Sequence, residues 1–458
     1  MNIIICGAGR VGYSISKQLS AQGHSITVID QSSEFIQKIN DTQDVNAVVG
    51  RATFPSVLEK AGAAETDMII AVTKDDETNM IICQVAHSIF NVNKKIARIR
   101  GQEFLGGKWG KLYGSSNLPI DVIISPELEV AKSLQRKLDA PGALDSVPFA
   151  GGKIKVLEIN IEKKCPLVNT ELSKLTERFP DLKANVLGVI REDKFKILKK
   201  KDKILINDKA FIVVNASQIN ITLSAFGHEE KLAKKILIVG GGNIGFNLAK
   251  ILETESEGVR VKIIEKNKSR AEFIANELNN TIVINGNGLD EDVLKEANIE
   301  EAETILSLTN DDEDNIMVSV LAEKNNPNKR TIALVNKQNY SLLQSSLKIN
   351  DLVDPRLTTI STILKHVHKG TIETVYTLLD GEYEFIEAEV LETSELISKS
   401  IRDSNLPEEI RIGAIVRGKD IIIPKSDFKF EKKDLVVFLT KREHLEKVES
   451  MFRISSLI

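Results

Sequence analysis

The stretch Ile3-Ile4-Ile5-Cys6-Gly7-Ala8-Gly9-Arg10-Val11-Gly12 near the start of the chain predicts its fold. An apolar run of strand length leads into three glycines spaced as G-x-G-x-x-G, and a helical pattern follows. The first glycine permits a tight turn, the second lets backbone approach a pyrophosphate, and the third lets helix and strand pack closely. The helix N-terminus adds free N–H groups and a partial positive charge. We therefore expect a nucleotide site here.

The same pattern returns halfway along the chain as Ile236-Leu237-Ile238-Val239-Gly240-Gly241-Gly242-Asn243-Ile244-Gly245. Further on, residues 72–79 are matched by 308–315, and residues 122–126 by 351–355. The matches keep their order while their spacing drifts slowly, which indicates a tandem duplication with small insertions and deletions.

Each half divides again. Its first part alternates strand and helix patterns, which predicts a Rossmann-like, doubly wound parallel sheet. In the first half the strands are expected at 2–6, 25–29, 45–49, 68–72, 95–100 and 121–124, and the helices at 11–21, 34–39, 54–60 and 79–90.

The second part of each half predicts a small, β-rich α+β domain. Strands are expected at 154–159, 186–191, 204–206 and 210–214 with a helix at 171–178, and at 383–390, 411–417, 420–423 and 434–439 with a helix at 395–402. This gives four domains, at 1–140, 151–226, 232–369 and 382–458, joined by linkers at 140–152, 217–235 and 369–382.

The composition excludes several classes of protein. The 458 residues carry 61 Lys+Arg against 65 Asp+Glu, a net charge of −4, whereas nucleic-acid binders usually have a basic excess. The apolar runs are only of strand length, too short to cross a membrane. Three cysteines (Cys6, Cys83 and Cys165) argue against a disulfide-stapled secreted chain. No signal sequence precedes the first strand pattern, so a soluble cytoplasmic protein is expected.

Acidic residues end the second strand of each half. Asp30 and Glu265 follow the glycine loops at the spacing of the residue that binds ribose hydroxyls. A carboxylate there repels a 2′-phosphate, which favours NAD over NADP.

Other candidates lie at later strand ends. Gly50 and Gly286 end the third strands, where they either admit adenine or simply make turns. Thr73 and Lys74 follow the fourth strand at the nucleotide edge, and Thr309 and Asn310 are their counterparts. Arg98 in the fifth strand could reach a phosphate or be an exposed edge charge. Its counterpart is Leu334, so only the first site would keep this arginine.

Catalytic groups are missing from this pattern. The Tyr-x-x-x-Lys spacing of Tyr13 and Lys17 falls in the helix under the cofactor, and no separate substrate domain is evident. No Walker A sequence is present. His366 and His368 point away from each other on a helix, so no metal site is expected. We therefore predict a ligand-sensing regulator and not an enzyme.

The order of these blocks resembles the TrkA family of Trk-system potassium uptake proteins, built from tandem RCK (regulator of K⁺ conductance) domains. The resemblance is carried by Gly7-Ala8-Gly9-Arg10-Val11-Gly12, Ala71-Val72-Thr73-Lys74-Asp75-Asp76-Glu77-Thr78-Asn79-Met80, Ile96-Ala97-Arg98-Ile99-Arg100, Ile238-Val239-Gly240-Gly241-Gly242-Asn243-Ile244-Gly245, Leu308-Thr309-Asn310-Asp311-Asp312-Glu313 and Ile412-Gly413-Ala414-Ile415-Val416-Arg417-Gly418.

The resemblance implies a regulatory subunit, peripheral on the inner face of the plasma membrane, that forms a homo-oligomeric ring, expected to be a tetramer. Its partner would be a separate potassium-transporting integral membrane subunit, with no nucleic acid involved. The implied ligands are NAD(H), with ATP and ADP as further candidates. The implied site residues are Gly7, Ala8, Gly9, Arg10, Val11, Asp30, Thr73, Lys74 and Arg98 in the first half, and Gly240, Gly241, Gly242, Asn243, Ile244, Gly245 and Glu265 in the second.

The chain departs from the family pattern after the third strands. Gly50-Arg51-Ala52 and Gly286-Asn287-Gly288 stand where the family often has Gly-His-Gly or Gly-Asp-Ala. The adenine contacts and the preference between NADH and ATP therefore stay open, and Arg51 could add a phosphate contact. Two alternative functions also stay open: an NAD-dependent oxidoreductase, and a free-standing redox or energy sensor.

Overall fold

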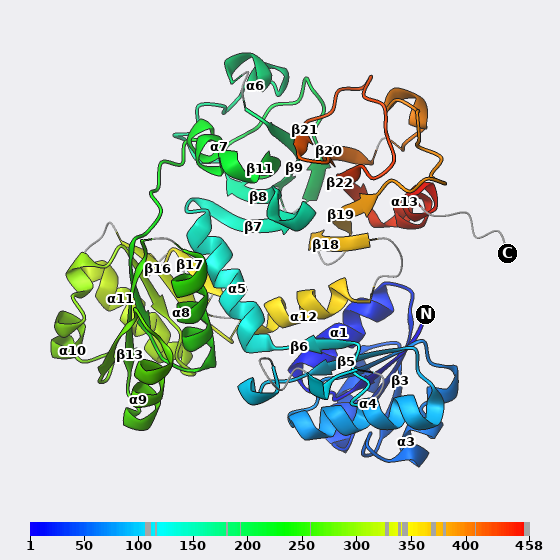
Figure 1. Cartoon of the computed structure of the whole chain (residues 1–458), viewed down its shortest axis with the longest axis vertical. Coiled ribbons are helices and arrows are strands. Elements are labelled where there is room, and N and C mark those ends of the chain that lie inside the picture. Colours follow the sequence, from blue (N-terminus) through cyan, green and yellow to red (C-terminus); the bar gives the residue numbers. More distant parts are fainter. Residues whose placement is uncertain are drawn as a thin grey trace. The chain divides into compact units, whose positions relative to one another are not determined.

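The chain folds into two compact units, each built from both halves of the sequence. The computed structural model describes residues 1–105, 111–114, 117–179, 182–192, 194–256, 258–325, 329–337, 340, 347–367, 372–378, 382–407 and 409–452. One unit combines Met1–Gln135 with Ala233–His366, and the other combines Arg136–Leu232 with Val367–Ile458. Figure 1 shows the first unit as the blue and yellow-green α/β parts. The four domain ranges proposed from the sequence stay a prediction.

The first unit holds two six-stranded parallel sheets. The first has the order β3-β2-β1-β4-β5-β6 and the second the order β14-β13-β12-β15-β16-β17. The strands are β1 (Asn2–Cys6), β2 (Ser25–Asp30), β3 (Asn46–Val49), β4 (Met68–Ala71), β5 (Lys94–Arg98) and β6 (Val122–Ile124), then β12 (Lys235–Val239), β13 (Arg260–Glu265), β14 (Ile282–Asn285), β15 (Thr304–Ser307), β16 (Arg330–Leu334) and β17 (Asp351–Val353). Both are Rossmann strand orders, which confirms the predicted fold class.

Helices connect these strands. They are α1 (Arg10–Ala21), α2 (Ser33–Thr42), α3 (Pro55–Lys60), α4 (Asp76–Phe90) and α5 (Pro126–Asp139), then α8 (Asn243–Glu255), α9 (Lys268–Glu277), α10 (Glu291–Glu296), α11 (Asp312–Asn325) and α12 (Pro355–Lys365). Central strands such as β1 are buried along nearly their whole length, because a parallel sheet is covered on both faces. None of the helices in the described ranges combines the length and apolar character that crossing a membrane requires.

The last helix of each parallel-sheet domain, α5 or α12, contacts the other parallel-sheet domain. Helix α12 packs against α1 and lies beside β6, and the Thr362 hydroxyl donates to Glu129 on α5 at 3.4 Å. In turn, Gln135 of α5 donates to Glu255 of α8 at 2.8 Å. The two parallel-sheet domains are therefore joined through contacts of α12 with the first domain and of α5 with the second.

The second unit holds two five-stranded antiparallel sheets with matching topology, β10-β9-β11-β8-β7 and β18-β19-β22-β20-β21. The strands are β7 (Ala143–Phe149), β8 (Ile154–Asn160), β9 (Ala184–Arg191), β10 (Lys194–Ile197), β11 (Lys209–Asn215), β18 (Ile372–Leu378), β19 (Tyr383–Glu389), β20 (Arg411–Arg417), β21 (Asp420–Ile422) and β22 (Leu435–Lys441), with helices α6 (Ser173–Arg178), α7 (Ile219–Ala225) and α13 (Leu445–Phe452).

One apolar core joins these two sheets. Phe211 and Phe385 are fully buried in it, with ring centroids 6.1 Å apart, and Phe195 lies 4.5 Å from Tyr383. Aromatic contacts of this kind add to the free energy gained from burying apolar area. The two small domains therefore stabilise each other.

Several sequence-based predictions about the second unit are wrong. The linkers predicted at 140–152 and 369–382 contain the edge strands β7 and β18. In the strand predicted at 204–206 only Ile204 makes an isolated bridge, to Val168, and residues 395–402 are not an α-helix. β7 contains Pro148, which looks like a strand breaker but is tolerated at a sheet edge, where no neighbour needs its missing N–H.

Candidate functional site

The first glycine loop lies between β1 and α1, at the point where the strand order reverses. Gly7 has φ +112°, and a Cβ there would lie 3.0 Å from the backbone nitrogen of Thr73, which follows β4. A Cβ on Gly12 would lie 1.8 Å from the Gly7 carbonyl oxygen, whereas one on Gly9 would meet no atom within 4 Å. Gly7 and Gly12 are therefore required by the fold, while Gly9 leaves open space where a ligand can approach.

The second loop repeats this geometry. Gly240 has φ +109°, a Cβ on Gly245 would lie 2.1 Å from the Gly240 carbonyl oxygen, and Gly242 has open space. In both halves, the open glycine precedes the first turn of a helix of at least 12 residues. Free N–H groups of that turn favour an anion.

The acidic residues brace these loops. Asp30 accepts from the Ala8 nitrogen at 2.6 Å with one carboxylate oxygen and from the Ser32 nitrogen at 2.8 Å with the other. Glu265 does the same with the nitrogens of Gly241 and Asn267, both at 2.8 Å. A carboxylate has lone pairs left for further donors, so the predicted ribose contact stays compatible with this bracing role.

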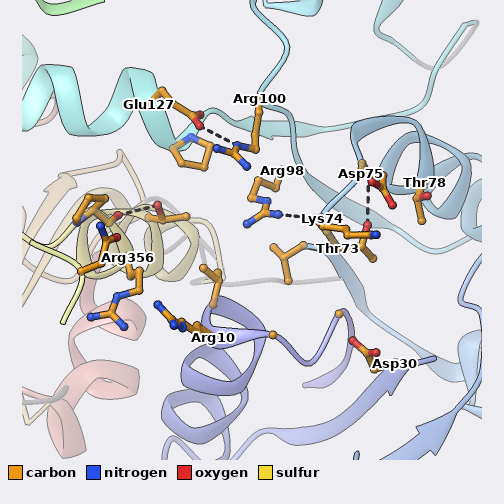
Figure 2. Close-up of a pocket in the computed structure, with 18 of the residues that line it drawn as sticks. Arg10, Asp30, Thr73, Lys74, Asp75, Thr78, Arg98, Arg100, Glu127 and Arg356 are labelled. Atoms are coloured by element: carbon orange, nitrogen blue, oxygen red, sulfur yellow. Dashed lines mark hydrogen bonds and ion pairs between the residues drawn. The ribbon is translucent and has the colours of Figure 1, made fainter. Parts of the chain in front are cut away.

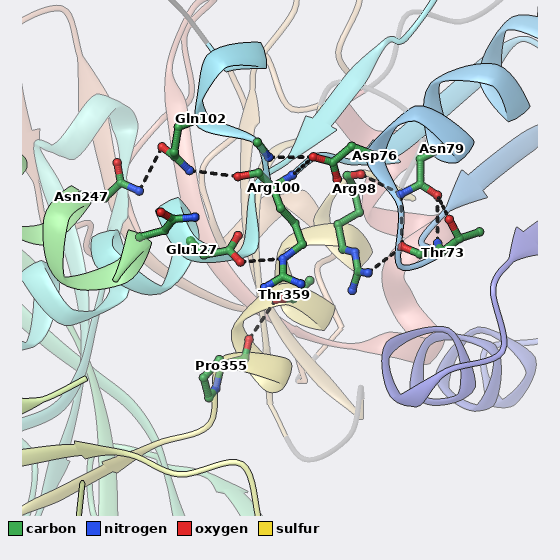
Figure 3. A network of polar contacts seen from close by, with 12 residues as sticks. Thr73, Asp76, Asn79, Arg98, Arg100, Gln102, Glu127, Asn247, Pro355 and Thr359 are labelled. Carbon is green, nitrogen blue, oxygen red and sulfur yellow. Dashed lines mark hydrogen bonds and ion pairs between the residues drawn. The ribbon is translucent and has the colours of Figure 1, made fainter. Parts of the chain in front are cut away.

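Two buried asparagines, which the sequence did not predict as site residues, join the ends of the fourth and fifth strands of each parallel sheet. The Asn79 amide oxygen accepts from the backbone nitrogen and hydroxyl of Thr73 at 2.9 and 2.7 Å, and its amide nitrogen donates to the Arg98 carbonyl at 2.8 Å (Figure 3). Asn315 makes the equivalent contacts with Thr309 and the Leu334 carbonyl. The repeated Thr-x₅-Asn spacing was the available signal.

Arg98 points into the site from the end of β5. One terminal nitrogen donates to the Thr73 carbonyl at 2.6 Å, while its buried Nε has no hydrogen-bond partner. No ion pair of Arg98 with a carboxylate occurs among the described residues. Burial lowers the pKa of this guanidinium, and the neighbouring Arg100 lowers it further. A half-buried cation without a paired carboxylate favours the binding of an anionic ligand.

A cleft of about 1120 Å³ opens over the first loop (Figure 2). Six cationic side chains line it against three carboxylates (Asp30, Asp75 and Glu127), and only Arg100 of the six is paired with one of these three, Glu127, at 2.7 Å. The cations are Arg10, Arg51, Lys74, Arg98, Arg100 and Arg356. The cleft therefore favours a ligand with several negative charges.

The structure brings most of the predicted first-site residues to this cleft: Gly7, Gly9, Arg10, Val11, Asp30, Gly50, Thr73, Lys74 and Arg98 line it, while Ala8 and Gly12 are buried behind the loop. A Cβ on Gly50 would lie 2.8 Å from the Val57 side chain on α3, so this glycine also packs closely against that helix. Gly286 has the same relation to Val293. Tyr13 donates to Thr42 on α2 at 3.0 Å, a structural contact.

The second cleft, of about 710 Å³, is different. Of the predicted residues, Gly240, Glu265 and Gly286 line only this cleft, and Gly242, Asn243 and Thr309 line both clefts. Ile244 lines only the first cleft, and Gly241 and Gly245 line neither. Arg270 lies across its glycine loop, donating to the Gly241 carbonyl at 2.8 Å with its guanidinium 4.9 Å from the Phe273 ring centroid. The cations among the described residues that line this cleft are Lys266 and Arg270, both on the segment that follows β13.

The cations of the first cleft have no cationic counterparts in the second. Aligning the repeats through their glycine loops and strand ends pairs each of the five first-half cations that line the cleft with a neutral residue of the second half. The pairs are Arg10 with Asn243, Arg51 with Asn287, Lys74 with Asn310, Arg98 with Leu334, and Arg100 with Asn336. The two sites have thus kept the same backbone while their charges differ.

No three metal-ligating side chains converge within the described ranges, and His368 lies outside them. The fold and the paired clefts define a tandem Rossmann-type protein with two small α+β domains. The TrkA-N domain model matches residues 3–126 and 236–355, and the TrkA-C domain model matches 385–453. The chain belongs to the TrkA family of Trk-system potassium uptake proteins.

Relatives over the full length support this assignment. The chain is 42% identical to the Trk system potassium uptake protein TrkA of Azorhizobium caulinodans and 37% identical to that of Vibrio alginolyticus, with 99% of both chains covered in each case. The family is one of transport-system proteins, which agrees with the prediction that the chain is not an enzyme.

Solved structures share the fold at low identity. The GsuK RCK domain has a TM-score of 0.60 and 17% identity, covering 98% of this chain and 94% of its own. A GsuK channel bound to NAD also has a TM-score of 0.60, with 16% identity, covering 98% of this chain and 78% of its own.

Proposed function

We propose that this chain is the cytoplasmic, nucleotide-sensing regulatory subunit of a Trk-type potassium uptake system. It binds NAD(H) or an adenine nucleotide at the first glycine loop. In a ring of identical subunits, expected to be a tetramer, it gates a separate potassium-transporting membrane subunit from the inner face of the plasma membrane.

The observation that carries the nucleotide site is Arg98. A half-buried guanidinium without a carboxylate partner among the described residues faces an open glycine loop and a helix N-terminus, and all three favour phosphate oxygens. The names of the relatives, which place them in a potassium uptake system, support the rest of the proposal. So does the fold shared with the GsuK channel, whose structure was solved with NAD bound.

The proposed mechanism is a population shift. A nucleotide that binds one arrangement of the regulatory ring more tightly than another changes the balance between them, by no more than the difference in affinity. Since the membrane subunit contacts the ring, its conducting state follows that balance.

Potassium flux tests this proposal. The membrane subunit would be reconstituted in liposomes with this chain, and uptake measured with NADH, NAD, ATP or ADP and with no nucleotide. We expect flux to depend on at least one nucleotide, and to lose that dependence with Arg98→Leu. Flux that ignores all four nucleotides refutes the gating proposal. Failure of the chain to bind membranes that contain the subunit would instead favour a free-standing sensor.

A further inference from the structure

Helix α12 brings a residue of the second half of the sequence to the first cleft. The helix packs against α1, and its N-terminal residues Pro355, Arg356 and Thr359 line the cleft over the first glycine loop. Figure 2 draws Arg356 beside the same cavity as Arg10 and Arg98. Residues around the second glycine loop, such as Ile244, also line this cleft, but among the described residues α12 adds the one arginine that the second half contributes to it.

Arg356 is held in place but keeps donors for a ligand. Its Nε and one terminal nitrogen donate to the two carboxylate oxygens of Asp354 at 2.9 and 2.6 Å. Asp354 also caps α12, accepting from the Arg356 backbone nitrogen at 2.9 Å. A guanidinium has five N–H donors, so about three stay available. The side chain is 25% exposed, so a ligand can reach it.

The surrounding charge favours an anion at this place. Arg10, Arg98 and Arg356 line one cleft, and among the described residues the side chains of Arg10 and Arg98 make no ion pair with a carboxylate. Gathering like charges is unfavourable unless an opposite charge lies between them. A phosphate can supply that charge and accept in bidentate fashion from a guanidinium, as Asp354 now does.

The counterpart of Arg356 in the first half has the opposite charge. The repeat aligns Pro355 with Pro126, so Arg356 corresponds to Glu127, which pairs with Arg100. Both Glu127 and Arg356 line the first cleft, and the described residues that line the second cleft include none from α5 or α12. The contribution of α12 is therefore specific to the first cleft.

We propose that Arg356 binds the terminal phosphate of a nucleoside di- or triphosphate in the first site. The second half thereby supplies a ligand contact to the first. Because α12 is continuous with the second half, an occupied first site ties the two halves together. This inference rests on the proposed nucleotide-binding function, and goes beyond it by assigning a residue and a phosphate-number preference.

Calorimetric titration of the full-length chain with ATP, ADP and AMP tests the assignment. Arg356→Gln removes the charge, and Asp354→Asn keeps a good helix cap while freeing Arg356 from its carboxylate. Lys295→Gln, on the exposed surface of α10, is the control for the same change in net charge. Melting curves establish that each variant folds, with Arg356→Lys as a further variant should Arg356→Gln fail to fold.

We expect Arg356→Gln, or Arg356→Lys in its place, to weaken ATP binding by about tenfold or more, the loss typical of a charge-assisted hydrogen bond. AMP binding should stay within about twofold, and Asp354→Asn should bind ATP at least as tightly as the wild type. An ATP affinity within about threefold of wild type overturns the proposal. So does a parallel loss of AMP affinity, or an Asp354→Asn variant weakened for ATP, since either result indicates a structural role.

The same titrations separate this inference from the proposed function. A wild-type chain that binds none of the three nucleotides counts against nucleotide sensing as a whole. A wild-type chain that binds ATP, with loss in Arg98→Leu but none in Arg356→Gln, removes only the role given to Arg356.

Discussion

Replacing Arg98 by leucine gives the first site the residue that the second site has at the equivalent position, which is Leu334. The second half shows that this backbone accepts leucine there, since Leu334 is 2% exposed at the end of its strand. The substitution therefore separates ligand binding from folding.

The structure sets the size of the expected effects. A hydrogen bond to a charged group contributes about 1.5–3 kcal/mol, so loss of the guanidinium should weaken phosphate binding by roughly 10- to 150-fold. Stability should change by less than about 1 kcal/mol. The Thr73 carbonyl keeps a donor, the Asn79 amide at 3.3 Å, and the variant no longer holds a half-buried cation whose Nε lacks a partner.

Isothermal titration with ADP, ATP and NADH measures the affinity, and urea unfolding measures the stability. Lys295→Gln is the control, because it removes an exposed cation of α10 that lines neither cleft. Its affinity for each nucleotide should equal that of the wild type. An affinity in Arg98→Leu equal to wild type would refute the reasoning that the buried guanidinium binds phosphate. A large loss of stability would refute the claim that its role is not structural.

Three further predictions concern the loop, its brace and a surface ion pair. Gly12→Ala should lower the free energy of unfolding by about 3 kcal/mol, since its Cβ meets a carbonyl oxygen at 1.8 Å. Gly9→Ala should cost no more than about 1 kcal/mol but weaken nucleotide binding, and paired urea and titration experiments check both. Asp30→Asn should cost about 1–3 kcal/mol in unfolding and also weaken binding, because an amide cannot accept from two backbone nitrogens through both of its terminal atoms; unchanged stability would contradict the bracing role. The contact with Lys337 lowers the pKa of Glu313 from 4.5 to about 2. Its contribution is therefore present above about pH 4.5 and is lost as the pH falls toward 2. The difference in melting temperature between wild type and Glu313→Gln should accordingly shrink over that range, and a difference that does not depend on pH would argue against the ion pair.

Much of the first unit could be predicted from the sequence. The apolar runs, the two glycine loops and the acids Asp30 and Glu265 were found from spacing alone, because each answers a local requirement. A parallel strand must be buried along its length, and a turn at positive φ or against a carbonyl oxygen admits only glycine. Such constraints act within a few residues, so the residue types that satisfy them can be recognised in a short stretch of sequence.

Contacts between distant segments were decided only by the tertiary structure. Asn79 hydrogen-bonds to both Thr73 and Arg98 because α4 packs beside β4 and β5. Asp30 accepts from the glycine loop because β2 ends next to it. The edge strands β7 and β18 were hidden because an edge needs fewer hydrogen bonds and tolerates proline. Arg356 reached the first cleft because α12 packs on a helix from the other half. Such placements depend on which helix and sheet surfaces pack together. A local sequence pattern does not determine this, because the packed surfaces come from segments far apart in the chain.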